Sequence, residues 1–168
     1  MFRKIKPEEL CDNPFSIIGG DWGLLTAVKP DGSFNPMTVS WGGLGILWRK
    51  PVCTVFVRPQ RYTHEFSQAG NRMSLCFFPP ERKEVLHYCG RVSGREGDKI
   101  KACDLTPVSE NGYVYYGDAR LVILCRKIYT DVIKPQGFIE TEPLDHYYPD
   151  KDFHTVYVCE IEEILIKD

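Results

Sequence analysis

The chain has 168 residues, of which 43% are hydrophobic and 26% are charged, and its formal net charge is −2. This length suits a single domain over residues 1–168 that is long enough to bury a core. The balanced charge gives no overall attraction to nucleic acid or to anionic membranes. No apolar run approaches the roughly 18 residues of a membrane span, and no apolar segment follows the positive charges near Met1, as a signal peptide would require. We therefore expect a cytoplasmic protein without nucleic-acid or membrane partners.

Seven cysteines are scattered along the chain. An odd number without a C-x-x-C pair fits neither a disulfide framework nor a zinc knuckle. Cysteine in an apolar, strand-like run usually acts as a small hydrophobic residue, and four stand in such runs: Cys53, Cys76, Cys125 and Cys159. The four histidines also lack metal-ligand spacing. The sequence therefore predicts structural thiols and no metal site.

The first half of the chain is predicted to alternate strands with turns. Residues 2–18 are expected to be irregular. A strand over 21–28 ends at the turn Pro30-Asp31-Gly32, because Pro pre-sets φ and Gly accepts a positive φ. Strands over 37–41 and 52–57 follow, with a loop rich in Gly and Trp between them. A short helix then runs from Thr63, its expected N-cap, to about residue 69.

The second half is predicted to hold more strands and two further helices. A strand covers 72–78, a helix opens at Pro80 and ends at Gly90, and a polar loop over 91–104 leads into a short helix near 99–103. Strands are expected over 113–116, 119–128, 129–133 and 155–166, with a loop over 140–152. About seven or eight strands without regular strand–helix alternation indicate a mainly β, antiparallel barrel with short peripheral helices.

The turn over 58–63 has the composition of a phosphate site. Arg58 and Arg61 supply charge and forked donors, and the predicted helix start near Thr63 supplies backbone N–H groups. Tyr62 and Thr63 add hydroxyl donors. The alternative is a solvated turn with two surface arginines, since charged side chains are mostly exposed.

Two further segments could complete a binding pocket. On the strand over 37–41, Thr38 and Ser40 share one face, opposite Met37 and Trp41, and offer hydroxyls to the polar edge of a heterocycle. The loop holding Ser93, Gly94 and Lys99 could form another wall. The alternatives are a half-buried strand with its polar face in water and an ordinary polar loop. With the turn, these segments suit a planar aromatic ligand that carries a phosphate.

Two motifs carry a resemblance to a known family. The first reads N-P-M-T-V-S-W-G-G-L-G over 35–45 and continues into K-P-V at 50–52 and V-R-P-Q-R-Y-T at 57–63. The second reads V-S-G-R-E-G-D-K over 92–99. Together they resemble the flavin reductase-like family with an FMN-binding split barrel, over about residues 19–106 and more weakly to the final strand.

The resemblance implies an antiparallel, Greek-key-like split barrel that forms a homodimer, with FMN near the subunit interface and NADH or NADPH as electron donor. By analogy, the flavin ring and ribityl chain would lie along Met37, Thr38, Ser40 and Trp41, and Asn35 at the start of the motif would also bind FMN. The phosphate would be held by Arg58, Arg61, Tyr62 and Thr63, and the pocket closed by Ser93, Gly94 and Lys99.

The chain departs from the family at one position. Many of the characterised reductases carry a Ser-Ser pair where this chain has Ser40-Trp41, and the bulky Trp41 bears on the access of nicotinamide to the flavin. The leading interpretation is an NAD(P)H-dependent flavin reductase that passes hydride to N5 of FMN. No catalytic acid or base is identified.

Other function classes stay open. A flavoredoxin-like electron carrier would hold FMN but receive electrons from a protein partner. A barrel that binds single-stranded nucleic acid would use Arg58, Arg61 and exposed aromatic rings, although the acidic balance counts against it. The related pyridoxamine-phosphate-oxidase-like barrels, which use the same FMN for different chemistry, are a further possibility.

Overall fold

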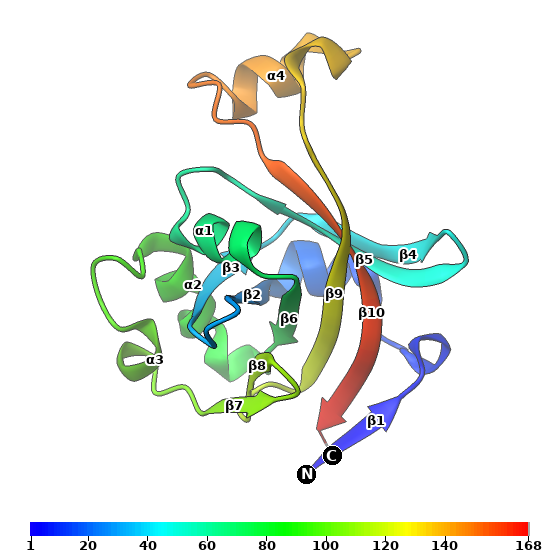
Figure 1. The fold of residues 1–168 in the computed structure, drawn as a ribbon, viewed down its shortest axis with the longest axis vertical. Coiled ribbons are helices and arrows are strands. Elements are labelled where there is room, and N and C mark those ends of the chain that lie inside the picture. The colour runs from blue at the N-terminus through cyan, green and yellow to red at the C-terminus, as the bar shows by residue number, and fades with distance from the viewer. Residues whose placement is uncertain (168) are drawn as a thin grey trace.

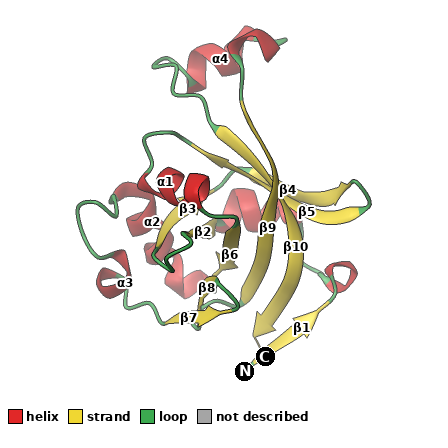
Figure 2. Cartoon of the chain, viewed as in Figure 1, coloured by secondary structure: helices red, strands yellow, loops and turns green. Residues whose placement is uncertain are grey.

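A curled antiparallel sheet forms the body of the protein in the computed structural model, which describes residues 1–167 (Figure 1). Short helices lie around it, as Figure 2 shows. The strands within these residues are β1 (Phe2–Ile5), β2 (Gly23–Val28), β3 (Phe34–Val39), β4 (Gly42–Leu47), β5 (Lys50–Val57), β6 (Arg72–Phe77), β7 (Pro107–Glu110), β8 (Tyr113–Tyr116), β9 (Leu121–Val132) and β10 (Thr155–Lys167). The α-helices are α1 (Tyr62–Ala69), α2 (Lys83–Arg91), α3 (Lys99–Ala102) and α4 (Thr141–Tyr147).

The sheet order explains how the body curls. In residues 1–167 the main sheet runs β3-β2-β6-β9-β10-β5-β4, and β1 pairs with β10 beside this path. Every pairing is antiparallel, including that of β7 with β8 in a second small sheet. Only Ser40 and Trp41 separate β3 from β4, so the two ends of the path must lie close together. The predicted mainly β, antiparallel architecture with short helices is confirmed.

Strand β2 lies between two hydrophobic clusters. All six of its residues are buried. Leu25 and Ala27 belong to the cluster inside the curled sheet, and Leu24 belongs to a second cluster that α2 and β8 cover. Because successive side chains of a strand point to opposite faces, the strand has no solvent-facing side. It therefore holds its hairpin partner β3, which carries the first motif, in a fixed place.

The glycine-rich segment after β3 is a strand, not the predicted loop. β4 pairs with β5 along its whole length. Trp48 and Arg49 make the turn with φ values of 51° and 60°, as in a two-residue hairpin with positive φ at both positions. At Gly42 a Cβ would lie 2.5 Å from the carbonyl oxygen of Thr54. The glycine thus permits close strand pairing, which the composition of the segment did not reveal.

Near the amino terminus, residues 2–18 are more regular than predicted. β1 pairs with β10 from Phe2 to Ile5, and a π-helix covers Ser16–Asp21. Trp22 has a φ of 66° after this helix, so the next strand begins at Gly23 and not at residue 21. The chain ends of the described structure lie side by side in Figure 1.

Several predicted boundaries in the rest of the chain were wrong. Helix α1 begins at Tyr62 with Arg61 as N-cap, two residues earlier than predicted. The strands predicted over 119–128 and 129–133 are the single strand β9, because β10 pairs with it throughout. The predicted loop over 140–152 contains α4, and β7 was not predicted.

Residues 133–154 form a segment that projects from the ends of β9 and β10 (Figure 1). It contains α4 and a 3₁₀ turn over Pro135–Gly137. The buried ring of Tyr148 contacts Phe138, Phe153 and His154, which gives the segment a small aromatic core. No helix within residues 1–167 is long and apolar enough to span a membrane.

Candidate functional site

A cavity of about 420 Å³ opens where β3, the start of α1 and the loop after α2 meet. Most of the predicted site residues line it: Met37, Arg58, Arg61, Tyr62, Thr63, Ser93, Gly94 and Lys99. The structure thus brings together two motifs that lie about thirty residues apart in the chain. Arg91 adds a further cation, and Asp152 is the one carboxylate in this lining among the described residues. The excess of positive charge suits an anionic ligand.

A smaller groove of about 190 Å³ continues from this cavity along β3. The two spaces share Met37, Arg58 and Arg61. The groove is lined by three more predicted residues of the first motif, Thr38, Ser40 and Trp41, together with Phe56 and His154. The cation-rich cavity and the flatter, partly aromatic groove therefore form one continuous site.

Arg61 and Lys99 are fixed by backbone carbonyls at the wall of the cavity. Arg61 Nη1 donates to the Gly90 carbonyl oxygen at 2.7 Å. Lys99 Nζ donates to the carbonyls of Pro36 at 2.8 Å and Cys89 at 3.1 Å. Burial lowers the pKa of Lys99, and the nearby charge of Arg61 acts in the same direction. Lys99 therefore joins β3 to α2 and adds positive charge to the wall.

Asn35, Thr63 and Gly94 pack tightly behind the cavity. Asn35 Nδ2 donates to Thr63 Oγ1 at 2.7 Å, and both side chains are buried. A Cβ at Gly94 would lie 2.0 Å from Asn35 Oδ1 and 3.0 Å from Tyr62 Cδ1. Asn35, predicted to contact the ligand, does not line either space. It supports Thr63 and leaves room only for glycine at position 94.

The Thr38 side chain also has a structural role, because it joins β3 to α2. Its hydroxyl donates to the carbonyl oxygen of Leu86 at 2.5 Å, and the side chain lies where a Cβ on Gly90 would reach 3.4 Å. These contacts hold β3 against α2. Thr38 and Ser40 both line the groove.

Asp152, in the 133–154 segment, forms an ion pair with Arg58. Arg58 Nη1 donates to Asp152, and its Nη2 donates to the Tyr147 carbonyl oxygen at 2.8 Å. Gln60 Nε2 also donates to Asp152, at 2.5 Å. These hydrogen bonds, that of Gln60 first, lower the pKa of Asp152. The carboxylate is charged at neutral pH, and the contact is lost only as pH falls through that lowered pKa.

His154 lies at the junction of the groove and the 133–154 segment. Its Nδ1 is 2.8 Å from the Tyr148 hydroxyl, and its ring lies 5.1 Å from that of Trp41. Burial, with the charge of Arg58 adding to it, lowers the pKa of His154 to about 4. The imidazole is therefore neutral at pH 7 and acts as a hydrogen-bonding and packing group.

Trp41 separates the groove from a third space. This apolar cavity of about 500 Å³ is lined by Trp41 and by aromatic residues of the 133–154 segment, including Phe138, Tyr147 and Tyr148. Trp41 is 42% exposed, and its ring meets that of Tyr147 edge-on at 5.1 Å. The indole thus forms a wall shared by two cavities.

Asp152→Asn is expected to tighten the binding of a phosphate-bearing ligand about two- to fivefold. The change removes the one carboxylate of the described cavity lining and frees Arg58, at roughly 0.5–1 kcal/mol for a partly exposed ion pair. Ligand titration at neutral pH measures the effect. Asp150→Asn is the control, because Asp150 is exposed and does not line the cavity. Weaker binding by Asp152→Asn alone would mean that the carboxylate serves to position Arg58.

Comparison with known proteins identifies the family. A family model described as flavin reductase like domain matches residues 17–168, which is most of the chain. The chain belongs to the flavin reductase-like family. No curated protein sequence matches it. The resemblance inferred from the two motifs is therefore confirmed at the level of the family.

Several solved structures share the fold of this flavin reductase-like chain. Flavoredoxin of Desulfovibrio vulgaris (Miyazaki F) matches with a TM-score of 0.69 and 19% identity, over 99% of this chain and 78% of that chain. An FMN-binding domain of a flavin reductase-like enzyme from Shewanella baltica OS155 matches with a TM-score of 0.67 and 14% identity, over 99% and 77%. The styrene monooxygenase flavin reductase of Pseudomonas putida S12 has a TM-score of 0.60 and 16% identity, over 86% and 78%. At these identities the likeness shows the fold alone.

Sequence reasoning missed the residues that this flavin reductase-like chain brings to the site from the 133–154 segment. Asp152 and His154 stand in a stretch without strand or helix periodicity and outside the two motifs. Gln60 and Arg91 were passed over although each lies in or next to a predicted wall. Their positions depend on contacts distant in sequence, so a linear pattern held no signal for Asp152 or His154.

Proposed function

We propose that the chain is an FMN-binding oxidoreductase that accepts hydride from NADH or NADPH, a flavin reductase. The observation that carries this proposal is the continuity of the site. A cavity with four cationic side chains (Arg58, Arg61, Arg91 and Lys99) leads directly into a groove flanked by Trp41 and lined by small hydroxyls. A ligand with a phosphate tail and a planar heterocycle matches this site, with the phosphate in the cation-rich cavity and the heterocycle in the groove. The described relative from Shewanella baltica is an FMN-binding domain, which supports the choice of FMN.

The residues present fit the cofactor. Arg61 uses one of its five guanidinium donors for Gly90 in the described contacts, so others can serve a phosphate. Gly94 lines the cavity with its backbone, and it packs so closely against Asn35 and Tyr62 that no Cβ fits there. Thr38, Ser40 and Trp41 would lie along the ring and ribityl chain. When bound, FMN would supply the hydride- and electron-transfer chemistry.

The chain itself would bind and orient rather than transfer protons. A guanidinium serves as a charged, forked hydrogen-bond donor for phosphate rather than as a proton donor, so we assign Arg58 and Arg61 to phosphate binding. His154 is neutral at pH 7 because its pKa lies at about 4, and it would support Trp41 at the edge of the groove. No residue is assigned a catalytic role.

We also propose a homodimer located in the cytoplasm. Edge strand β4 and its turn expose Ile46 at 72% and Trp48 at 59%, and the ring of Trp48 lies 6.1 Å from that of the half-exposed Tyr129 on β9. An apolar edge strand favours association with another chain. The seven free thiols suit a reducing compartment.

The alternative function is an FMN electron carrier that is reduced by a protein partner. Trp41 favours it, because the indole stands between the groove and the apolar cavity beside it and would restrict the approach of a nicotinamide ring. A partner protein would need only the flavin edge.

The visible absorption spectrum of the purified protein tests both functions. After incubation with FMN and removal of the excess, the protein is expected to be yellow and to bleach when NADH or NADPH is added without oxygen. Yellow protein that does not bleach would favour the carrier, and protein that retains no flavin would contradict the proposal of FMN binding.

A Trp41→Ser variant sharpens this experiment. If Trp41 restricts the donor, the variant bleaches faster than the parent at equal flavin content. Phe15→Ser is the control, since Phe15 is an exposed aromatic residue that lines neither the cavity nor the groove. Equal rates in all three proteins would remove Trp41 as the reason for a carrier role.

A further inference from the structure

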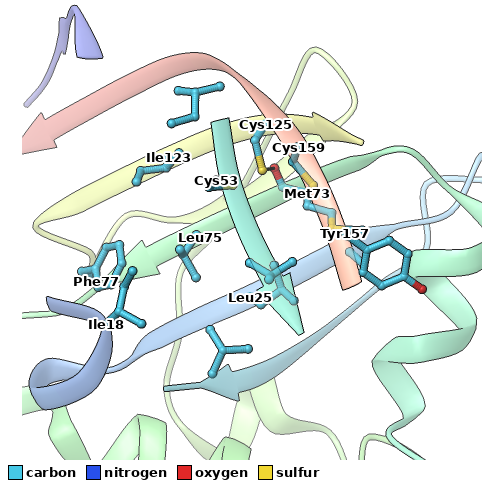
Figure 3. Close-up of a cluster of buried hydrophobic side chains, with 14 of the residues drawn as sticks. Ile18, Leu25, Cys53, Met73, Leu75, Phe77, Ile123, Cys125, Tyr157 and Cys159 are labelled. Atoms are coloured by element: carbon cyan, nitrogen blue, oxygen red, sulfur yellow. Dashed lines mark hydrogen bonds between the residues drawn. The ribbon is translucent and has the colours of Figure 1, made fainter. Parts of the chain in front are cut away.

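Three cysteine side chains meet inside the curled sheet, apart from the proposed flavin site. Cys53 on β5, Cys125 on β9 and Cys159 on β10 come from three adjacent strands, and their sulfur atoms all lie within 4.8 Å of one another. Figure 3 shows the three labelled side chains in the cluster of buried residues. Each is 0% exposed, and none lines the cavity or groove described above.

Strand register creates this meeting point. Cys53 and Cys159 are directly opposite each other in the β5–β10 ladder. Cys125 is opposite Ile161, two residues further along β10, so its side chain points to the same face. Linear spacing of 72 and 34 residues between successive cysteines, from positions 53, 125 and 159, gave no indication of a group of three.

The donor set around this point consists of sulfur. Within the described residues the group of ligand atoms contains no histidine and no carboxylate. Met73, also fully buried, is opposite Cys125 in the β6–β9 ladder, and the Cys125 thiol donates to the Met73 carbonyl oxygen at 3.5 Å. Structural zinc takes four ligands, commonly with nitrogen or a fourth thiolate. Soft thiolate and thioether donors select Cu(I), zinc or iron–sulfur clusters. Zinc and iron–sulfur clusters take four protein ligands, so a group of three sulfur atoms fits Cu(I) best.

One cation lies close enough to offset the charge of such a site. Lys127 is opposite Cys159 in the β9–β10 ladder, and its Nζ donates to the Ser67 carbonyl oxygen at 2.5 Å. Residues directly opposite each other in a ladder point to the same face of the sheet, so the Lys127 and Cys159 side chains share one face. Cu(I) held by two thiolates and one thiol carries one negative charge, which the ammonium of Lys127 balances. That balance matters because an uncompensated charge is costly in an apolar core.

We propose that Cys53, Cys125 and Cys159 form a binding site for one Cu(I) ion. Binding of the ion displaces two protons from the thiols, with no change in the oxidation state of copper or sulfur. The ion joins β5, β9 and β10, three neighbouring strands of the main sheet. Since the site exists only in the folded chain, bound Cu(I) raises the stability of the fold by mass action.

The test uses the full chain carrying Cys11→Ser and Cys103→Ser. These changes remove the exposed and the half-buried thiol, which would otherwise take up Cu(I) outside the core. Cu(I) is supplied without oxygen in competition with bathocuproine disulfonate, both to native protein and during refolding, so that slow entry cannot imitate an absent site. The expected result is one Cu(I) per chain, sulfur-only coordination by X-ray absorption, and a raised thermal midpoint.

Single substitutions locate the ion. Cys125→Ser and Cys159→Ser are expected to weaken Cu(I) binding by at least about tenfold, since each removes a ligand. Cys76→Ser is the matched control, because Cys76 is equally buried but outside the group, and it should bind as the parent does. Retained FMN binding reports that each variant is folded, as none of these residues lines the flavin site.

Thiol footprinting on the parent keeps the proposal testable if a serine variant does not fold. Under mild conditions that open the fold only transiently, bound Cu(I) should slow the alkylation of Cys53, Cys125 and Cys159 more than that of Cys76 and Cys89, because the ion must leave before its ligands react. Uptake of no Cu(I) during refolding, equal binding by Cys125→Ser, or displacement of Cu(I) by equimolar Zn²⁺ would each overturn the proposal.

Discussion

A Gly94→Ala variant is expected to bind FMN at least tenfold more weakly than the parent. The new methyl group would lie 2.0 Å from Asn35 Oδ1 and 3.0 Å from Tyr62 Cδ1. Asn35 cannot move cheaply, because it is 5% exposed and donates to Thr63 at 2.7 Å. The loop must therefore move, at about 1–3 kcal/mol for overpacking, and Ser93 moves with it. Titration of FMN fluorescence measures the loss.

Two matched variants define the cause. Gly97→Ala lies in the same loop, but its added Cβ meets nothing within 4 Å, so its FMN affinity should not change. Asn35→Ala combined with Gly94→Ala removes the atom that the methyl group would strike. The double variant should therefore lose less affinity than the two single losses added together. Equal losses from Gly94→Ala and Gly97→Ala would show that general loop disturbance, and not the contact with Asn35, is responsible.

An Arg61→Ala variant is expected to lose about ten- to a hundredfold in affinity for FMN. A hydrogen bond between charged groups contributes roughly 1.5–3 kcal/mol, and Arg61 lines both the cavity and the groove. Riboflavin, which lacks the phosphate, should bind the variant almost as well as the parent. The two ligands compared on one variant separate phosphate binding from damage to the site.

Arg49→Asn is the control for the charge of Arg61. Arg49 is exposed on the β4–β5 turn with a φ of 60°, a conformation that asparagine tolerates. The Arg49→Asn variant should bind FMN as tightly as the parent does. If Arg61→Ala weakened riboflavin and FMN equally, the role of Arg61 would be its 2.7 Å hydrogen bond to Gly90, and the phosphate assignment would be wrong.

The sequence predicted correctly those elements that depend mainly on neighbouring residues, such as turns and short strands. The turn Pro30-Asp31-Gly32 and the apolar runs on either side of it gave β2 and β3 within a few residues. Pairing decided what those patterns left open. β4 consists largely of glycine and exposed apolar residues, and only its ladder with β5 makes it a strand.

The same distinction applies to the sites. The two motifs contain most of the residues that line the cavity. They could be recognised in the sequence because such a site needs particular residue types, namely cations for charge and glycine for close packing. Asp152 reaches Arg58 across 94 positions in the chain, and the three core cysteines meet through the register of β5, β9 and β10. Neither arrangement can be derived before the strand order is known.

The burial of β2 on both faces has a consequence for how the molecule opens. Its amides bond to β3 on one side and β6 on the other, and hydrophobic clusters cover both of its surfaces. We therefore expect hydrogen exchange at β2 to require unfolding of the body of the protein. The 133–154 segment should open more readily, because outside its own aromatic core it is held by its contacts with Arg58, Gln60 and Trp41. The first motif would then be attached to a slowly exchanging strand, and Asp152 to a faster segment.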